Sequence, residues 1–227
     1  MGIEEFRLVN GHLTKNGCYL IPITPDKFEA DSYAIADIIL DDRMAIYKDQ
    51  RPLMIPLGRG GYRTFLPMHG RFRSVLRTKE DKKDIPYESV KTQRCQEGEI
   101  NVFDELKIDE QDIEKVLKAL KHCSEGIIID DVCDRGTSIE GVRILLNGEG
   151  KPVIRVAAHT KKEAHPASLE PEYAIRNYKS KEIEGQRFFP WLVYPHERED
   201  HGKKLWEIMF PKLCADSKAA YEELVAA

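Results

Sequence analysis

The sequence contains no long apolar run, little net charge and no paired cysteine motif, and each absence excludes a class of protein. No apolar run approaches the roughly 20 residues that span a bilayer, so we expect no membrane segment. The 227 residues carry 35 basic and 39 acidic side chains, and the net charge of −4 predicts neither a nucleic-acid surface nor a polybasic membrane face. The first six residues hold two acids and no basic side chain, so we expect no secretory signal.

Cysteines are few, odd in number and scattered. There are five, without any C-x-x-C spacing: Cys18, Cys95, Cys123, Cys133 and Cys214. Neither a disulfide framework nor a zinc site fits this pattern. We therefore expect reduced thiols that are buried as small apolar side chains in a cytoplasmic protein.

The apolar residues that are present indicate alternating helices and strands. Helical spacing marks residues 26–42, 111–122 and 139–146, and continuous apolar runs mark residues 53–57, 127–129 and 153–158. Such runs are typical of parallel strands that are covered on both faces. A strand, a loop, a helix and a strand within about 30 residues predict a βαβ unit. The fold class is therefore α/β, with a mainly parallel twisted sheet flanked by helices.

Charged and polar segments predict less regular structure elsewhere. We interpret residues 58–61 as a turn that stops a strand, and residues 69–88 as an exposed, strongly charged excursion. Residues 87–94 have the pattern of a strand. Apolar residues after position 201 share one helical face, which predicts a C-terminal helical tail.

The most informative segment is residues 127–138, Ile-Ile-Ile-Asp-Asp-Val-Cys-Asp-Arg-Gly-Thr-Ser. In open α/β sheets, ligands bind beyond the carboxyl ends of the strands. Asp130 and Asp131 would lie there, facing ribose hydroxyls or Mg²⁺, which prefers few carboxylates plus substrate oxygens. The loop and the helix N-terminus that follow offer N–H groups and hydroxyls to a phosphate. Neither the P-loop pattern nor the dinucleotide fingerprint is present.

The pattern Asp130-Asp131-Val132-x-Asp134-x-Gly136-x-Ser138 resembles the signature of type I phosphoribosyltransferases, in which two acids and a D-T-G-x-T loop bind phosphoribosyl pyrophosphate. The resemblance implies that the acid pair holds the ribose hydroxyls, directly or through Mg²⁺. It also implies that Asp134 accepts or donates a proton at N7 of a purine. The residues implied to wrap the 5′-phosphate are Arg135, Gly136, Thr137 and Ser138.

Two positions depart from that signature. Ser138 replaces the final threonine and keeps its hydroxyl. Arg135 stands where the family usually has threonine, and it either adds a cation at the 5′-phosphate or points away.

Residues 58–61, Gly-Arg-Gly-Gly, are by themselves typical of a simple turn. Beside the acid motif they resemble the pyrophosphate loop of the same family. The resemblance implies that Gly58 and Gly60 let backbone N–H groups approach the diphosphate while Arg59 offers a charge-assisted fork. It further implies a strained cis peptide bond between Gly58 and Arg59.

Two more segments resemble base-binding parts of the purine branch. Residues 188–197, Phe-Phe-Pro-Trp-Leu-Val-Tyr-Pro-His-Glu, have the pattern of an aromatic core strand and are also similar to the hood of the xanthine-guanine enzymes. The resemblance implies that Trp191 stacks on the purine and that the Leu192 backbone meets the base edge. It places Glu197 at the metal or at the C2 side of the base. The second segment is residues 157–162, Ala-Ala-His-Thr-Lys-Lys, at the end of a predicted strand. The resemblance implies that Lys161 meets the C6 oxygen of the purine, with Lys162 as its rival.

The resemblance covers roughly residues 25–200 and implies a magnesium-dependent purine phosphoribosyltransferase. Such an enzyme joins guanine, xanthine or hypoxanthine to phosphoribosyl pyrophosphate, releases pyrophosphate and assembles as a homodimer or homotetramer. We place a phosphoribosyltransferase-like α/β domain with hood elements at both ends over residues 1–200, and a helical extension over residues 201–227.

Two alternatives stay open. One is a regulatory protein that senses phosphoribosyl pyrophosphate and binds nucleic acid or a partner. Its concentrated basic candidates are Arg71, Arg73 and Arg77. The other is an enzyme of the same family with a non-purine acceptor.

Overall fold

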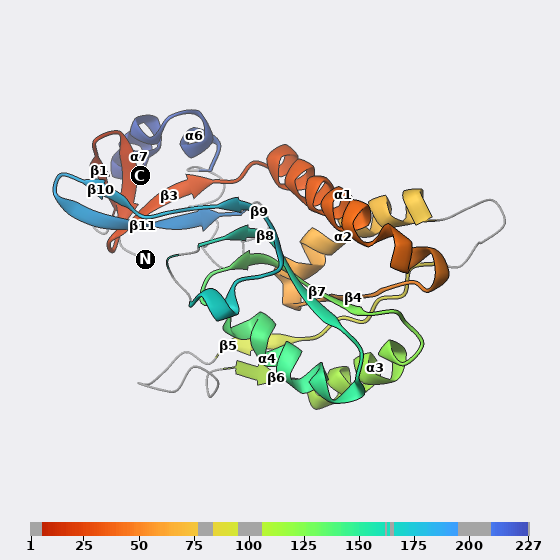
Figure 1. The fold of residues 1–227 in the computed structure, drawn as a ribbon. Helices are drawn as coiled ribbons and strands as arrows, with labels where there is room; N and C mark the ends of the chain where they lie inside the picture. The colour runs from red at the N-terminus through yellow and green to blue at the C-terminus, as the bar shows by residue number, and fades with distance from the viewer. Residues whose placement is uncertain are drawn as a thin grey trace. The chain divides into compact units, whose positions relative to one another are not determined.

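The structure is a computed structural model that describes residues 6–76, 84–94, 106–161, 163, 166–194 and 210–226 (Figure 1). The chain forms two compact units. The first comprises Met1–Phe28 and Tyr178–Ala227, and the second comprises Glu29–Asn177. Each unit has a sheet of its own.

A parallel sheet with the strand order β4-β7-β8-β9 forms the centre of the second unit (Figure 1). The strands are β4 (Leu53–Pro56), β7 (Gly126–Cys133), β8 (Val153–Thr160) and β9 (Tyr173–Asn177). All neighbouring pairs are parallel. The predicted α/β class with a mainly parallel sheet is therefore confirmed.

Helices cover both faces of this sheet (Figure 1). They are α1 (Pro25–Asp49), α2 (Gly58–Leu76), α3 (Glu110–Leu120) and α4 (Thr137–Leu146). Ile127 and Ile129 of β7 share a core cluster with apolar residues of α1 and α2, whereas Ile128 shares one with residues of α3 and α4. Because successive side chains of a strand point to opposite faces, burial on both sides explains the continuous apolar runs. Short 3₁₀ turns follow at Asn147–Glu149 (η2) and Ala167–Leu169 (η4).

A further extended segment runs along β4. Parallel bridges join Met54 to Tyr87 and Leu57 to Val90. Backbone hydrogen bonds of 2.9–3.1 Å link Met54 with Pro86, Glu88 with Met54, Val90 with Pro56, and Gly58 with Val90. The chain then enters β5 (Thr92–Arg94), which pairs antiparallel with β6 (Leu106–Ile108). Lys91 and Thr92 are thereby placed at the carboxyl edge of the parallel sheet.

The structure corrects three sequence-based predictions. Residues 58–61 open a helix instead of forming a loop, because α2 begins at Gly58. Residues 69–76 continue that helix and are not an exposed excursion, since Phe72 and Leu76 are buried in the core. Residues 77–83 lie outside the described part of the chain. The strand predicted over 87–94 is divided into isolated bridges followed by β5.

The first unit holds a sheet with the order β1-β2-β3-β11-β10. Its strands are β1 (Phe6–Val9), β2 (His12–Lys15), β3 (Cys18–Pro22), β10 (Lys181–Ile183) and β11 (Gln186–Val193). β3 and β11 pair in parallel, and the other neighbours are antiparallel. Of the C-terminal helices, α6 (Phe210–Ala215) brings Phe210 and Leu213 to the core of this unit, and α7 (Ser217–Ala226) brings Ala220. The predicted C-terminal helices are confirmed over residues 210–226, and residues 201–209 lie outside the described ranges.

The described cysteines follow the sequence-based expectation in part. Cys123 and Cys133 are buried, whereas Cys18 is half-buried and Cys214 is exposed. Cys95 lies outside the described residues. Within the described ranges, no helix combines the length and the apolar composition that a membrane crossing requires.

Candidate functional site

Three neighbouring strands bring their carboxyl ends to one edge of the parallel sheet. β4 leads into Gly58, β7 ends at Cys133, and β8 ends one residue before Lys161. Because these strands are parallel and adjacent, the segments that follow them meet at the same edge. The site residues predicted in this unit that gather there are Gly58, Arg59, Gly60, Asp130, Asp131, Asp134, Arg135, Gly136, Thr137, Ser138 and Lys161.

Asp134 and Lys161 form an ion pair at this edge. The Lys161 Nζ lies 3.4 Å from Asp134 Oδ2, and the two side chains are 17% and 32% exposed. The Lys161 N–H donates a 3.0 Å hydrogen bond to the Cys133 carbonyl, which holds the segment after β8 beside the loop after β7. The lysine predicted for the base and the carboxylate predicted for proton transfer are therefore within reach of one ligand. Lys162 lies outside the described residues.

Each of the two carboxylates near the end of β7 accepts a hydrogen bond from the backbone N–H of the residue that follows it. Asp130 Oδ1 accepts a 3.0 Å hydrogen bond from the Asp131 N–H, and Asp131 Oδ1 accepts one of 2.8 Å from the Val132 N–H. Asp131 is buried and faces α2, because a Cβ added to Gly60 would lie 2.5 Å from Asp131 Oδ2. Negative charge is favourable beside the N-terminal turn of a helix, so this position suits a carboxylate.

Close packing explains the glycines at the start of α2. A Cβ added to Gly61 would lie 2.2 Å from the carbonyl oxygen of Ile129, so only glycine lets the first turn of α2 lie on β7. Gly58 has a φ of 50°, in the left-handed region that favours glycine. The prediction of a cis bond between Gly58 and Arg59 is wrong, because this peptide bond is trans. The positive φ of Gly58 turns the chain from β4 into α2 instead.

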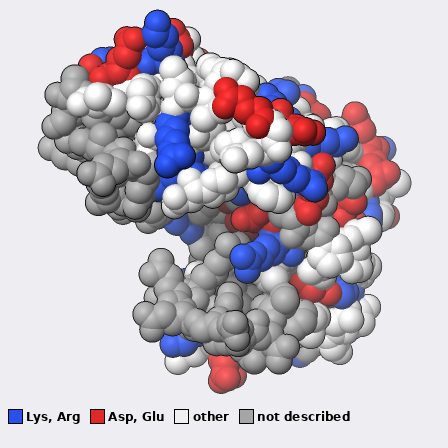
Figure 2. Space-filling model, turned by 90° about the vertical axis from the view of Figure 1, so that its left-hand side faces the viewer, with Lys and Arg blue, Asp and Glu red and all other residues white. Residues whose placement is uncertain are grey.

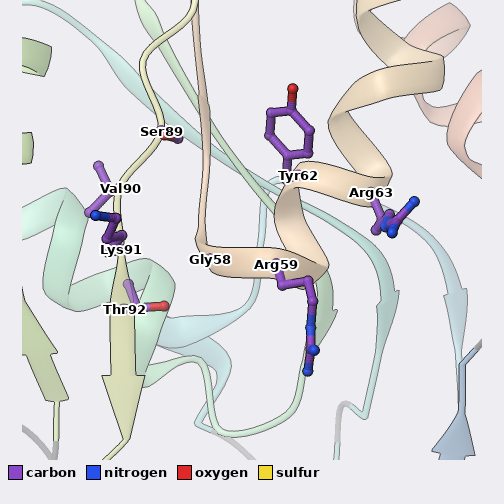
Figure 3. Close-up of a pocket in the computed structure, with 8 residues that line it drawn as sticks. All are labelled: Gly58, Arg59, Tyr62, Arg63, Ser89, Val90, Lys91 and Thr92. Atoms are coloured by element: carbon purple, nitrogen blue, oxygen red, sulfur yellow. The ribbon is translucent and has the colours of Figure 1, made fainter. Parts of the chain in front are cut away.

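A cavity of about 510 Å³ opens beside the start of α2 (Figure 3). Its lining residues are Gly58, Arg59, Tyr62 and Arg63 of α2, and Ser89, Val90, Lys91 and Thr92 of the segment along β4. Three of these side chains are cationic and two carry aliphatic hydroxyls, a combination that suits an anion with several oxygens. The Thr92 hydroxyl faces the turn, because a Cβ added to Gly58 would lie 3.4 Å from its Oγ1.

Helix α2, Lys91 and Thr92 are parts of the site that the sequence motifs do not indicate. Helical spacing of Phe65, Met68, Phe72 and Leu76 is the signal that would have revealed α2. Lys91 and Thr92 are polar residues that directly follow Val90, and Val90 is bridged to Leu57, the residue after β4. That position relative to the sheet edge is what marks them as candidates.

The loop after β7 presents backbone groups to a ligand. Gly136 has a φ of 76° and precedes α4 without a side-chain cap for the helix. The first N–H groups of an α-helix have no partner within the helix, so they are available to an anion at this end. Ser138 is buried, Thr137 is half-buried and Arg135 is exposed.

Cys133 is buried within this motif, with 1% exposure. Burial raises the pKa of its thiol to about 12, so the thiol is protonated at neutral pH. Its Sγ lies 3.7 Å from the Leu169 carbonyl oxygen, to which it donates a weak hydrogen bond.

An ionic cluster supports β8 just before Lys161, in which Asp31 and His159 are buried and the Arg176 side chain is 47% exposed. His159 Nε2 lies 3.0 Å from Asp31 Oδ2, and Arg176 reaches the same carboxylate with two hydrogen bonds of 2.7 and 2.8 Å. Burial raises the pKa of Asp31, but the hydrogen bonds from Arg176 and His159 outweigh it and hold the pKa below its ordinary value. The cluster therefore ties α1, β8 and β9 together through an ionised carboxylate.

Mg²⁺ fits the acid pair only as an ion shared with a ligand. In the described part of the chain, no three histidine, cysteine, aspartate or glutamate side chains gather as a metal centre. Asp130 and Asp131 supply two carboxylates at the edge of the sheet. Mg²⁺ commonly takes one or two carboxylates and completes its shell with water and substrate phosphate oxygens, so this donor set is compatible with it.

The predicted base-binding residues Trp191 and Leu192 lie on β11 of the first unit. Leu192 is only 3% exposed and is paired with Ile21 of β3, so contact of its backbone with a base stays a prediction. Trp191 packs against the core cluster of this unit, and Lys15 Nζ lies 6.0 Å from the centroid of its ring. The segment is thus an aromatic core strand, and base stacking by Trp191 stays a prediction. Glu197 lies outside the described residues.

Comparison with known proteins gives a structural match alone. No protein-family model matches the sequence, and no curated protein matches it. Among solved structures, a hypoxanthine phosphoribosyltransferase from Trypanosoma cruzi matches at 14% identity over 68% of this chain and 75% of that chain, with a TM-score of 0.51. A mutant of the Trypanosoma cruzi enzyme in a ternary substrate complex matches at 12% identity over 68% and 78%, with a TM-score of 0.50.

A purine phosphoribosyltransferase from Pyrococcus horikoshii covers more of the chain. It matches at 17% identity over 79% of this chain and 95% of that chain, with a TM-score of 0.47. We assign the fold from the two Trypanosoma cruzi structures, because their TM-scores are higher than that of the Pyrococcus horikoshii enzyme. The chain therefore has the fold of the hypoxanthine phosphoribosyltransferases, as the resemblance of its motifs predicts.

Proposed function

We propose that this protein is a phosphoribosyltransferase that transfers the 5-phosphoribosyl group of phosphoribosyl pyrophosphate to a 6-oxopurine and releases pyrophosphate. The observation that carries the proposal is the gathering, at one sheet edge, of the α2 start, the acid pair, the Gly136 loop and the Asp134–Lys161 ion pair. Each part of the two substrates meets suitable chemistry along that edge.

The diphosphate would lie at the start of α2. Arg59 and Thr92 border the cavity beside Gly58, and the first N–H groups of the helix face the same end. An arginine fork and a hydroxyl bind phosphate oxygens through charge-assisted and neutral hydrogen bonds.

The ribose 5-phosphate part would extend from the acid pair to the Gly136 loop. Asp130 and Asp131 would accept hydrogen bonds from the ribose hydroxyls, and Gly136, Thr137 and Ser138 would surround the 5′-phosphate. Magnesium, when bound at the acid pair, supplies positive charge that stabilises the departing diphosphate. Arg59 adds a fixed cation for the same leaving group.

The ion pair supports a 6-oxopurine as the acceptor. In such a base, the C6 oxygen and N7 lie on the same edge of the ring system. The 3.4 Å between Lys161 Nζ and Asp134 Oδ2 therefore lets Lys161 donate to the oxygen while Asp134 accepts a proton from N7. An adenine amino group would meet the lysine donor to donor, which leaves both groups unpaired.

In the proposed reaction, the bond from ribose C1′ to the diphosphate breaks and the bond from C1′ to the base N9 forms. The ribose passes through an oxocarbenium-like state, as in glycosidic cleavage. The base nitrogen and C1′ must be held in line, which is the work of the groups at the sheet edge. The proton that the base loses goes to Asp134.

Two alternatives are distinguished by charge and by assay. The basic residues that suit a nucleic-acid regulator are paired with acids, since Arg71 Nε lies 2.6 Å from Asp37 Oδ1 and Arg73 Nε lies 2.8 Å from Asp84 Oδ1. On the face drawn in Figure 2, basic and acidic side chains of the described residues are interspersed. Arg77 lies outside those residues. An enzyme with a non-purine acceptor would show itself by its choice of base.

The test is pyrophosphate release by the purified chain with phosphoribosyl pyrophosphate, Mg²⁺ and one base at a time. We expect release and a nucleoside monophosphate with guanine, xanthine or hypoxanthine, and little with adenine. Release with adenine or a pyrimidine as the best acceptor would overturn the base assignment. Binding of phosphoribosyl pyrophosphate without release in the presence of any base would favour the regulatory alternative.

A further inference from the structure

A segment that no motif predicted lies against the loop proposed to bind the 5′-phosphate. It comprises residues 166–172, which include η4. A Cβ added to Gly136 would lie 2.8 Å from the Leu169 Cβ and 2.9 Å from the Leu169 carbonyl oxygen. The Cys133 thiol donates to that same carbonyl oxygen. The loop and the segment are therefore in direct contact on the side of the loop where Gly136 has no side chain.

One side chain of β8 anchors this segment. Arg155 is largely buried, with 11% of its side chain exposed. Its Nη1 donates a 3.0 Å hydrogen bond to the Ser168 carbonyl oxygen, and its Nη2 donates one of 2.7 Å to Glu172 Oε1. The backbone N–H of Arg155 donates to Glu172 Oε2 at 2.6 Å. The segment is thereby fastened to β8 at Ser168 and at Glu172.

The same guanidinium also holds the first turn of α4. Arg155 Nη1 lies 3.1 Å from Glu140 Oε2, and Glu140 is buried with 7% exposure. The Glu140 N–H donates a 3.0 Å hydrogen bond to the Gly136 carbonyl, so this carboxylate is one turn from the loop. A hydrogen bond from Arg143 lowers the pKa of Glu140, although burial raises it, and Arg155 adds to the lowering. Glu140 is therefore ionised at neutral pH and available to both arginines.

We infer that Arg155 is a positioning residue for the binding of the 5′-phosphate, because it fastens residues 166–172 and the first turn of α4 on either side of the Gly136 loop. The inference rests on the proposed function, which makes that loop the phosphate site. Arg155 itself touches no substrate. It acts through Leu169 and Glu140, which hold the loop in the conformation that presents its N–H groups.

Arg155 and Arg143 both bind Glu140. Comparison of their variants therefore separates the positioning of residues 166–172 from the general stability that either arginine gives to α4. Arg143 binds Glu140 with two hydrogen bonds, of 2.7 and 2.5 Å, and its side chain is 30% exposed. Removal of either arginine leaves Glu140 with one cation. Removal of the Arg155 side chain also breaks its hydrogen bonds to Ser168 and Glu172 and leaves only the backbone bond to Glu172, whereas removal of Arg143 leaves all of these contacts in place. Arg143→Met is therefore the matched control for Arg155→Met.

The test is calorimetric titration of ribose 5-phosphate, and separately of pyrophosphate with Mg²⁺, into the full chain and the two variants. We expect Arg155→Met to raise the Kd for ribose 5-phosphate about tenfold, which corresponds to about 1.4 kcal/mol. Its Kd for pyrophosphate should stay within about twofold of the parent value, because the diphosphate would bind at α2. Arg143→Met should stay within about twofold for both ligands.

Each outcome supports or overturns the inference. If the parent chain binds neither ligand, the proposed function fails and the inference fails with it. If the parent binds both and Arg155→Met has the parent Kd for ribose 5-phosphate, only the inference is overturned. An equal loss for both ligands also overturns it, since a general distortion would produce that result. A mere loss of folded protein lowers the binding stoichiometry and leaves the Kd unchanged, which again contradicts positioning.

Glu172→Gln provides a second variant if Arg155→Met does not fold. It keeps the Arg155–Glu140 pair and the hydrogen bond from Arg155 to Ser168, and it removes the charge of Glu172, the other contact between residues 166–172 and Arg155. We expect Glu172→Gln to raise the Kd for ribose 5-phosphate less than Arg155→Met does. The Kd for pyrophosphate should again stay unchanged. Parent affinity for both ligands in a folded Glu172→Gln protein would overturn the inference.

Discussion

Gly60 lies where α2 meets the acid pair, and its replacement by alanine should separate ligand binding from folding. The added Cβ would lie 2.5, 2.6 and 2.7 Å from Asp131 Oδ2, Cγ and Oδ1. Non-bonded heavy atoms prefer roughly 3.5–4.0 Å, so the carboxylate must move by about 1 Å. It is the end of a side chain and can rotate away, which keeps the cost to folding small. Alanine also favours a helix by about 0.5–1 kcal/mol relative to glycine.

Two other glycines of the same helix give the comparison. In Gly61→Ala the new Cβ would lie 2.2 Å from the Ile129 carbonyl oxygen, so α2 and β7 would have to separate. Overpacking of this kind costs about 1–3 kcal/mol, and a contact with backbone belongs at the upper end because no rotamer relieves it. A Cβ on Gly70 meets nothing within 4 Å, so Gly70→Ala should stabilise α2 by about 0.5–1 kcal/mol.

Thermal unfolding and steady-state kinetics on the three variants test this reasoning. One kcal/mol corresponds to a Tm shift of about 2–4 °C in a chain of this size. We therefore expect the Tm of Gly70→Ala to lie above that of the parent, the Tm of Gly60→Ala to lie near it, and the Tm of Gly61→Ala to lie below it. A misplacement of about 1 Å can cost about 10²-fold in rate, so kcat/KM should fall by that order in Gly60→Ala. Gly70→Ala should have the parent kcat/KM.

Two results would contradict these expectations. Parent activity in a stable Gly60→Ala protein would mean that the position of Asp131 does not matter for the reaction. A Gly60→Ala protein as unstable as Gly61→Ala would mean that the carboxylate cannot give way, so the change would act on the fold.

Three further changes test other parts of the site. Asp134→Asn should lower kcat by about 10²–10⁴ with little change in the affinity for phosphoribosyl pyrophosphate, and an unchanged kcat would remove Asp134 from proton transfer. Arg59→Ala should weaken phosphoribosyl pyrophosphate more than ribose 5-phosphate in calorimetry, and equal losses would mean that Arg59 does not act on the diphosphate. The pKa of Asp31 in the folded state lies below its ordinary value of 3.8, so its contribution to stability is present above about pH 4 and is lost as the pH falls through the lowered pKa. Urea titrations should therefore show a steeper loss of stability on acidification in the parent than in Asp31→Asn, and parallel curves would contradict the ionic cluster.

The parallel sheet could be predicted from the sequence because strands that are buried on both faces consist of consecutive apolar residues. The run Ile127–Ile129 is apolar throughout, and its side chains enter the two separate core clusters. The sequence alone also predicts that Asp130 and Asp131 lie at the strand end, since a parallel sheet has one ligand-binding edge.

The start of helix α2 could not be recognised in the same way, because it depends on a tertiary contact. Three glycines in residues 58–61 favour a turn by local propensity. In the fold, Gly61 is the residue that permits contact with the Ile129 carbonyl, so the glycines serve helix–strand packing. The charges of Arg71 and Arg73 further obscured the buried positions of Phe72 and Leu76.

The sequence indicates residues that would contact the substrates more readily than residues that only position the backbone of the site. Asp134 and Lys161 are visible because each follows an apolar strand, and the order of the strands then brings them to 3.4 Å. Arg155 lies inside β8, and nothing near it in the sequence links it to Glu140 or Ser168. Its effect exists only once α4 and residues 166–172 have folded against β8. A substitution far from the motif can therefore change ligand affinity through backbone position alone, which is why binding measurements on Arg155 and Gly60 discriminate more sharply than further substitutions within the acid pair.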